Sequence, residues 1–429
     1  MGSDIFIGVI GFIISIISST AFIWGPLLLG WFCFFLWHHY VEERFIGGIE
    51  WSVLEVHIPR EMDKSPLAMQ LFITNALYHK SGKGVWETYW QGAVHFWFSL
   101  EMASIDGRFH FFIRTPSRLK HLVETQLYAQ YPQVKVEEVP DYTEVIPKYR
   151  HDGGWYLWGC DFTAEGDDAL PIKTFADFGL DKLDLKEQYK IDPLTPTLEF
   201  LGSLQRGEQL WIQIIIRFTK KQYPGPHGHK VDFYDHSDIF LDEMLEMFKN
   251  KKLRDDGSEY MEIRVPDTIK DTVLAIKDKT SELAFDTVIR LVVLGDKNLV
   301  SAETFNNTRR ASRLLFRQYT NPNENALIRI NSTQYDSTWA DPTGRLLEKM
   351  KHRHLTYYKL RTAFYPPLLM SFDFPAPLTW FFPSYRPKVF VLNTEELATI
   401  YHFPGLVSGS PAFKRIESKT AKPPANLPF

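Results

Sequence analysis

The chain begins with a long apolar segment. Residues 5 to 37, IFIGVIGFIISIISSTAFIWGPLLLGWFCFFLW, contain no charged side chain. This run exceeds the roughly 18 apolar residues that indicate a membrane-spanning helix. A secretory signal peptide is not favoured, because the segment lacks a basic start and its apolar part is too long. We therefore predict that residues 1–46 form a transmembrane segment.

The run is too long to cross a bilayer as one upright helix. It would extend about 50 Å at about 1.5 Å per residue, whereas the hydrocarbon core is about 30 Å thick. It must tilt, kink or fold back, and Gly25-Pro26 is the natural break. The pattern leaves a single kinked span and a hairpin of two short spans open. Tryptophan favours membrane interfaces, so the candidate interface residues are Trp24, Trp31 and Trp37.

Beyond Gly48 the pattern changes to short strands and amphipathic helices. Strands are expected at 51–59, 93–102, 108–114 and 134–139, with helices that open at Ser65-Pro66 and Thr115-Pro116. Ile105-Asp106-Gly107 is a strong hairpin signal between the second and third strands. The order βαββαβ is the split pattern of a ferredoxin-like domain, which we place at residues 47–145.

The same order recurs in residues 146–335. Strands are expected at 155–162, 209–218, 285–294 and 326–330, with helices that open at Thr195-Pro196 and Ser301, the latter running to about Tyr319. LYAQY (127–131) and LFRQY (315–319) end corresponding helices, which favours a duplication. Residues 219–283 are a polar insertion of helix and loop.

The predicted fold is therefore α+β: a transmembrane segment followed by tandem ferredoxin-like domains, the second with a long insertion. Each predicted sheet has one face covered by helices and one open face. The open face needs a partner, a ligand or solvent.

Residues 336–429 contain three different segments. Residues 345–361 are predicted to form a basic helix, and residues 365–383, with five prolines, an extended arm. The stretch NTEELATIYHFPG (393–405) is predicted to begin with a short helix. Asn393 can cap that helix, and Glu395 and Glu396 favour its positive end.

Composition narrows the classes of protein. Hydrophobic residues make up 45% and charged residues 23%, as in a folded chain. The formal net charge of −4 means that any surface for nucleic acid must be local. Cys33 and Cys160 cannot form a disulfide framework, which favours a reducing compartment for the soluble part.

Few patterns indicate catalysis. SGKG (81–84) lacks the rest of a phosphate-binding loop, and no H-E-x-x-H, C-x-x-C or G-x-S-x-G motif occurs. One cluster of possible metal ligands consists of His227, His229, Asp232, Asp235 and His236. It is either a zinc site or a solvated loop, and we favour the loop because no matching distal ligand pair exists. We therefore expect no metal, no cofactor and no enzymatic activity.

The predicted basic helix is a candidate surface for anions. Its cationic residues are Arg345, Lys349, Lys351, Arg353, Lys359 and Arg361. Nucleic-acid phosphates, anionic lipids or an acidic protein can bind such a surface, although a solvated charged face is the simpler interpretation. Phe109 and Phe111 do not match the RNA-binding signature of this fold class, so we expect them in the core.

Four blocks of the sequence resemble a known family. They are residues 49–66, 105–143, 192–217 and 389–428, the last ending in KTAKPPANLP. They resemble the membrane-anchored N-terminal region of uncharacterised bacterial proteins that belong with type IV secretion and conjugative DNA-transfer ATPases of the P-loop translocase class. The resemblance covers nearly the whole chain after the membrane segment, but this region has no known catalytic residues.

The resemblance implies a non-enzymatic, membrane-anchored scaffold or assembly subunit of a type IV secretion-like, conjugative machinery. It implies the bacterial inner membrane, with the soluble domains in the cytoplasm. In longer relatives the block that ends in PPANLP leads into the ATPase domain. This sequence ends at Phe429, so we expect the P-loop ATPase to be a separate chain.

The segment from 389 onward is then a candidate docking tail. Its candidate docking residues are Asn393, Glu395, Glu396, Tyr401 and Phe403. A terminal helix packed on its own domain is the alternative. Two other functions stay open: a membrane-tethered module that binds DNA through residues 345–361, and an enzyme that uses the 227–236 cluster. Self-association is open as well.

Overall fold

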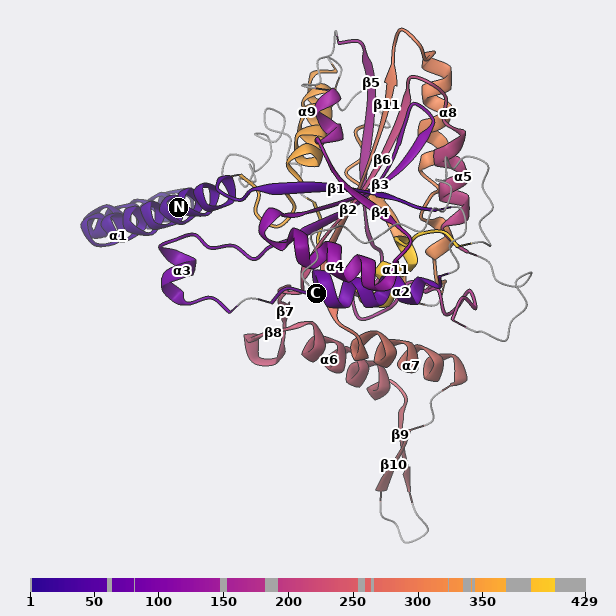
Figure 1. The fold of residues 1–429 in the computed structure, drawn as a ribbon. Helices are drawn as coiled ribbons and strands as arrows, with labels where there is room; N and C mark the ends of the chain where they lie inside the picture. The colour runs from indigo at the N-terminus through magenta and orange to yellow at the C-terminus, as the bar shows by residue number, and fades with distance from the viewer. Residues whose placement is uncertain are drawn as a thin grey trace. The chain divides into compact units, whose positions relative to one another are not determined.

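The fold is taken from a computed structural model of the 429-residue chain. It describes residues 2–59, 64–80, 82–146, 153–181, 192–253, 259–263, 266–322, 324–334, 341, 344–367 and 387–405. The chain divides into two compact units. Figure 1 shows their helices and strands. The smaller unit contains residues 1–49 and 81–94, and the larger contains most of the remaining chain.

The apolar N-terminal segment is one continuous helix, α1 (Gly2–Gly47), with Pro26 inside it. The chain therefore does not fold back at Gly25-Pro26 as the hairpin alternative requires. Proline is tolerated inside such an apolar helix. Its stretch Ser18–Gly47 is long and apolar enough to cross a membrane, a criterion that a signal sequence near the N-terminus also meets. α3 (Val85–Tyr89) lies in the same unit.

The larger unit is built on a nine-stranded antiparallel sheet. Eight strands follow the order β12-β5-β11-β6-β2-β3-β1-β4, and β13 pairs with β11 beside β5. The strands are β1 (Trp51–His57), β2 (Phe98–Ile105), β3 (Arg108–Pro116), β4 (Lys135–Val139), β5 (Trp155–Ala164), β6 (Glu208–Phe218), β11 (Ala284–Asp296), β12 (Leu327–Ile330) and β13 (Phe390–Asn393). This is a mixed α+β fold, as the sequence predicts.

The sheet consists of two halves with the same relative strand order. The first half runs β4-β1-β3-β2 and the second runs β12-β5-β11-β6. They join where β2 pairs antiparallel with β6, from Phe98↔Ile216 to Ile105↔Gln209, and we call this pairing the seam. The expectation of two separate sheets needs correction here. Each half alone would leave a long edge strand with unpaired backbone groups, and pairing β2 with β6 satisfies them.

Most predicted elements are confirmed, with three differences, the first being that β2 begins at Phe98 and not at the predicted residue 93. Ser65 caps α2 (Pro66–Phe72), and Asp106 and Gly107 form the β2–β3 turn with positive φ angles of 51° and 75°. Thr115-Pro116 instead ends β3, and α4 (Lys120–Gln130) begins after a short 3-10 turn. Ser301 caps α8 (Ala302–Ser312), which ends before the predicted Tyr319. Thr115 pairs with Ser52 in the sheet, which favours the extended backbone there.

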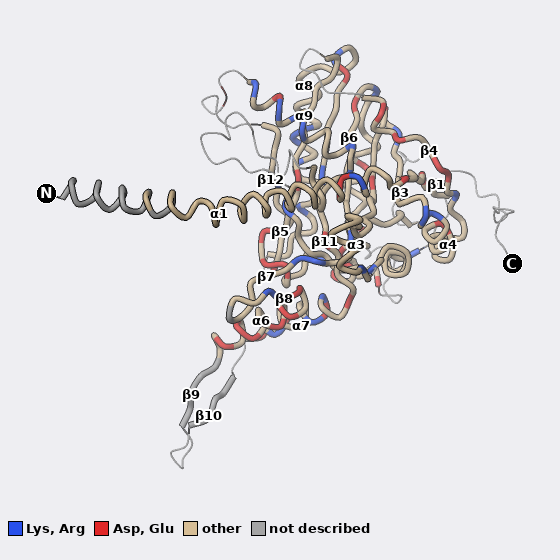
Figure 2. Tube along the Cα trace, turned by 90° about the vertical axis from the view of Figure 1, so that its left-hand side faces the viewer, with Lys and Arg blue, Asp and Glu red and all other residues tan. Residues whose placement is uncertain are grey.

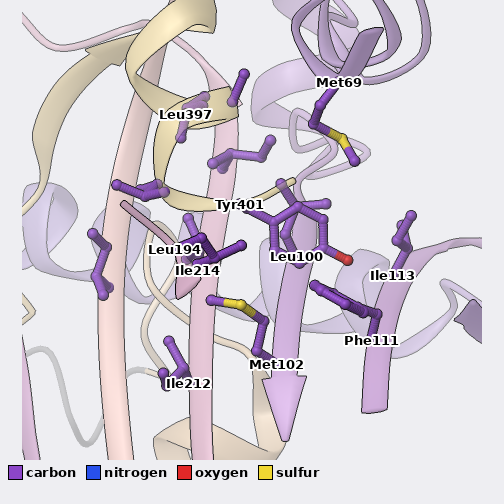
Figure 3. Close-up of a cluster of buried hydrophobic side chains, with 14 of the residues drawn as sticks. Met69, Leu100, Met102, Phe111, Ile113, Leu194, Ile212, Ile214, Leu397 and Tyr401 are labelled. Carbon is purple, nitrogen blue, oxygen red and sulfur yellow. The ribbon is translucent and has the colours of Figure 1, made fainter. Parts of the chain in front are cut away.

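One face of the sheet carries the main hydrophobic core (Figure 3). Leu100, Ile214 and Leu291 of the central strands are fully buried there. They pack with side chains from α2, α4, α5 (Thr195–Ser203) and α11 (Thr394–Ile400), represented by Met69, Leu127, Leu198 and Leu397. The alternation of strand side chains places these residues on the same face.

The opposite face is covered too. A second cluster contains Val292, Trp211 and Phe112 from the strands, with Leu355 and Tyr358 from α9 (Arg345–Leu360). Val292 lies between Leu291 and Val293 of the first cluster, so the two clusters are on opposite faces. The sequence-based expectation of open sheet faces is therefore wrong over this central region, because α9 covers it.

The insertion between β6 and β11 consists of helices and small hairpins. Its elements are β7 (Tyr223–Pro224), β8 (Lys230–Val231), α6 (Phe233–Glu246), β9 (Lys249–Leu253), β10 (Glu259–Ile263) and α7 (Asp267–Ser281). α6 and α7 pack on each other around Leu241 and Ile276. This matches the helix and loop material that the polar sequence of 219–283 predicts.

The C-terminal segment (residues 390–403) joins the two halves on the core face. β13 extends the second half by pairing with β11. Farther along, the Phe403 ring lies 5.1 Å from the ring of Phe111 and 4.9 Å from that of Tyr131, both in the first half. One short segment therefore contacts both halves of the sheet.

We predict that Phe403→Ala destabilises the larger unit by about 3–5 kcal/mol, because it opens a cavity among buried aromatic rings. Leu314→Ala is the control, since Leu314 is 58% exposed and its truncation should cost no more than about 0.5 kcal/mol. Urea unfolding of the full chain in detergent measures both. Equal unfolding midpoints for the two variants would contradict the packing of this segment.

Candidate functional site

Arg361 lies at the end of the basic helix and turns into the sheet. Its φ angle is +48°, in the left-handed region that non-glycine residues seldom adopt. Its backbone N–H donates to the carbonyl of Tyr358 at 3.1 Å, which ends α9. The side chain is fully buried. The strained backbone, at a cost of about 1–2 kcal/mol, directs the guanidinium toward the sheet instead of solvent.

Every N–H of this guanidinium has an acceptor. Nε and Nη2 donate to the two oxygens of Glu101, at 2.9 and 3.1 Å. Nη2 and Nη1 donate to the two oxygens of Asp141, the former at 3.0 Å. The remaining Nη1 hydrogen reaches the carbonyl of Lys359 at 2.9 Å. Two forked carboxylate pairs and one carbonyl therefore account for the donors of an arginine side chain.

Glu101 holds this arginine at the seam. It is fully buried in β2, and its register partner in β6 is Gln213. Its carboxylate also accepts hydrogen bonds from Gln213 Nε2 at 3.0 Å, Tyr142 OH at 2.8 Å and Ser99 Oγ at 2.6 Å. We call Arg361, Glu101, Asp141, Tyr142, Gln213 and Tyr358 the Arg361 cluster. It connects α9 to both halves of the sheet.

The electrostatics of the Arg361 cluster favour fixed charges. Burial alone would raise the pKa of Glu101, but the charge and hydrogen bonds of Arg361 hold it below its usual value. Burial alone would lower the pKa of Arg361, but the charge and hydrogen bonds of Glu101 raise it above its usual value. Burial and the charge of Glu101 raise the pKa of Tyr142 and Tyr358, so both phenols stay neutral hydrogen-bond groups. The guanidinium and the carboxylates of Glu101 and Asp141 are hydrogen-bonded within the chain, whereas the buried Oε1 of Gln213 has no hydrogen-bond partner among the described residues. The closed set of charged groups suits a structural role.

A second buried pair anchors the middle of α9. His354 Nε2 lies 3.3 Å from Asp161 Oδ1 in β5. Burial would raise the pKa of Asp161, but His354 and Arg290 lower it below its usual value. Gly159 makes the close approach of the helix possible, because a Cβ there would lie 2.4 Å from Nδ1 of His354. α9 is thus fixed to the sheet at two polar positions.

These contacts change the predicted anion surface. Arg361 is not part of any surface, and Lys359 donates to the carbonyl of Ile146. Lys351 pairs with Glu348 at 2.9 Å. Arg345 and Lys349 are exposed, and Arg353 is half-buried. The six predicted cations therefore divide between the outer face of α9 and its contact with the sheet.

The predicted docking residues are engaged within the chain. Asn393 caps α11, accepting from the N–H of Glu396 at 2.8 Å, as the sequence predicts. Glu396 is buried against Lys279 of α7, with 3.1 Å between its Oε2 and Nζ. Tyr401 and Phe403 are buried as well, while Glu395 is half-buried and burial raises its pKa. The alternative of a helix packed on its own domain describes this segment, and its buried side chains are not available to a partner. Residues 406–429 of the docking tail and most of the 365–383 arm lie outside the described residues.

The 227–236 cluster is divided among other contacts. Asp232 caps α6 by accepting from the N–H of Asp235 at 3.0 Å. His236 lies 3.0 Å from Asp167 Oδ1 and stacks on Tyr223. Within the described part of the chain, no three His, Cys, Asp or Glu side chains are grouped as metal ligands.

A small cavity of about 120 Å³ lies beside this insertion. Its charged lining residues are Asp167, Asp168, Lys221 and Lys388. Asp168 already accepts from Lys221 Nζ and from Tyr223 OH. The cavity is too small for a nucleotide or another large cofactor, and its charges neutralise one another in part.

Sequence reasoning missed the acidic partners of Arg361. The available signal was a long polar side chain in the middle of each of two apolar strands, Glu101 in FSLEMASI and Gln213 in EQLWIQIIIRF. No protein-family model matches the chain, and a search of curated proteins finds no match. The geometry of the chain itself therefore carries the functional argument.

We predict that Arg361→Met costs about 3–5 kcal/mol, because it leaves Glu101 buried without a cation. Arg345→Met, on the exposed end of the same helix, is the control and should change the free energy of unfolding by less than about 0.5 kcal/mol. Urea unfolding of the full chain in detergent measures both changes. A loss no larger for Arg361→Met than for Arg345→Met contradicts the account.

The pH dependence gives a second test of the same cluster. A lowered pKa at Glu101 and Asp141 means that their contribution is complete above the ordinary value near 4 and is lost as pH falls through the lowered values. In Arg361→Met the cation that lowers the pKa of Glu101 is gone, so burial should raise that pKa above its usual value. The variant should then gain stability as the pH falls. The difference in stability between wild type and variant should shrink as the pH is lowered from 7 toward 4. A difference that does not change with pH contradicts this prediction.

Proposed function

We propose that this protein is a non-enzymatic, membrane-anchored scaffold of a type IV secretion-like, conjugative machinery, which docks a separate P-loop ATPase. The observation that carries the proposal is the combination of an exposed apolar helix with a sheet covered on both faces. Buried polar groups of the larger unit, such as Arg361 and Glu101, hold its parts together. Such a construction suits a rigid platform at a membrane. We place it at the bacterial inner membrane, with the larger unit in the cytoplasm.

We infer further that the two halves of the sheet are duplicated ferredoxin-like units. Each half has the element order βαββαβ and the same relative strand order. Their fusion through the seam leaves β4 and β12 as the terminal strands of the sheet. β4 carries Lys135, Glu137 and Glu138, while β12 is short and exposes Ile328 and Arg329.

The sheet edges are the proposed docking surfaces. An extended segment of a partner can add to an exposed edge through backbone hydrogen bonds. The clustered charges of β4 oppose such pairing, whereas β12 carries an apolar side chain beside its single arginine. The β12 edge is therefore the better candidate for the ATPase, together with residues 406–428 of the tail.

We predict that the cross-linked full chain, purified in detergent, retains a P-loop ATPase. Ile328→Lys should reduce the yield of that partner. A lysine on the β12 edge would be covered by the added strand, and burying its charge opposes the pairing. Glu137→Lys, at an exposed position of β4, is the control and should leave the yield unchanged. Absence of any P-loop ATPase after cross-linking, or ATP hydrolysis by the purified chain alone, argues against the scaffold.

Binding of DNA by α9 is the second candidate, favoured by the exposure of Arg345 and Lys349 one turn apart. With Arg353, they offer two or three phosphate contacts, so the logarithm of the binding constant should fall with the logarithm of salt concentration at a slope of about −2 to −3. Arg345→Glu with Lys349→Glu should abolish binding, and Lys270→Glu on α7 should not. A slope near zero excludes this candidate.

A further inference from the structure

Residues 82–94 form an exposed aromatic segment between α2 and β2. They belong to the same compact unit as α1. The segment contains α3, none of whose residues is buried. Its large exposed side chains are Val85 at 76%, Trp86 at 61%, Tyr89 at 45% and Trp90 at 55%. Four such side chains within six residues form an apolar patch of the kind that marks a contact surface.

This segment lies along one face of α1. The Tyr89 ring is 5.9 Å from Phe34 and 5.4 Å from His38, and the Trp90 ring is 5.7 Å from Trp37. These α1 residues are three or four positions apart and therefore share a face. The backbones of the segment and of α1 are in close contact at Gly92, whose φ is +65°. A Cβ at Gly92 would lie 2.3 Å from the backbone of Val41.

The contact falls where the apolar run of α1 ends. Trp37 is the last residue of the uncharged stretch, and it is followed by His38, His39, Glu42, Glu43 and Arg44. In Figure 2 the part of this apolar stretch that is not grey is drawn tan. Beside this boundary Trp86 and Trp90 stack with their ring centroids 5.0 Å apart. Tryptophan and tyrosine at such a boundary have apolar rings for the acyl chains and N–H or O–H groups for the headgroups.

We propose that residues 82–94 are a second membrane-contacting segment, which places Trp86, Tyr89 and Trp90 in the headgroup–acyl boundary of the bilayer that α1 crosses. The occupant is lipid because the patch continues the exposed apolar surface of α1 at Trp31, Trp37 and Tyr40. This inference rests on the proposed membrane anchoring by α1.

The proposal also assigns each tryptophan of α1 a depth in the bilayer. With Trp37 at this boundary, Trp31 lies about 9 Å and Trp24 about 20 Å farther along the helix, at about 1.5 Å per residue. A hydrocarbon core of about 30 Å then ends near Ser18, where Ser18, Ser19 and Thr20 are polar. Of the predicted interface residues, Trp37 then lies at the bilayer interface beside residues 82–94, and Trp24 lies within the hydrocarbon core of the bilayer.

Single-cysteine labelling of the full chain in vesicles of phosphatidylcholine and phosphatidylglycerol tests the proposal. Cys33 of α1 is exposed, whereas Cys160 is buried and burial raises its pKa, which protects it from reagents. Three proteins carry an environment-sensitive nitrobenzoxadiazole label: wild type at Cys33, Cys33→Ser with Val85→Cys, and Cys33→Ser with Met247→Cys. Met247 follows α6 and is 75% exposed, so it supplies the aqueous reference.

We expect the label at position 85 to resist aqueous iodide several-fold better than the label at 247, and to be quenched by doxyl-labelled lipid. Adding Trp86→Ser and Trp90→Ser should move position 85 toward the aqueous reference and leave Cys33 unchanged. A label at 85 that iodide reaches as easily as position 247, with Cys33 protected, overturns this inference and retains the anchor. Protection from iodide without quenching by lipid also overturns it, since protein then covers the patch. If iodide reaches Cys33 as well, the proposed anchoring fails.

Discussion

The larger unit depends on one buried interaction, the double ion pair of Arg361 with Glu101 and Asp141. Charges in a dry interior are costly unless they are paired and hydrogen-bonded, and here every donor of the guanidinium is used. Because Glu101 sits opposite Gln213 at the seam, the pair fixes α9 over the junction of the two halves. The interaction therefore specifies which surface of the helix faces the sheet.

The same construction decides which surfaces remain for partners. α9 covers the central part of one face, and the helices with the C-terminal segment cover the other. Glu396, Tyr401 and Phe403, which look like docking residues in the sequence, instead connect α7 and the first half of the sheet. Among the described residues, the exposed surfaces include the outer side of α9, the terminal strands of the sheet, and the apolar surface of the smaller unit. A scaffold that binds through its periphery is consistent with this distribution.

Sequence patterns predicted local structure well and long-range pairing poorly. Alternating apolar residues and the Asp106-Gly107 turn located the strands, and the capping role of Asn393 was legible from its spacing to Glu396. The pairing of β2 with β6 could not be predicted in this way, because an apolar strand such as QLWIQIIIRF has the same sequence pattern at the edge of a sheet and at the seam. Likewise, Arg361 resembles the other cations of its helix in sequence. The left-handed turn at the end of α9 separates it from them, and its partners Glu101 and Asp141 lie more than 200 positions away in the sequence.

The most direct test of a single sheet spanning both halves is amide hydrogen exchange of the full chain in detergent at increasing denaturant. The account predicts that the amides of β2 and β6 are among the best protected and lose protection together, at the same denaturant concentration as β1 and β11. Loss of protection in one half while the other remains protected, with early exchange at the seam, would contradict it.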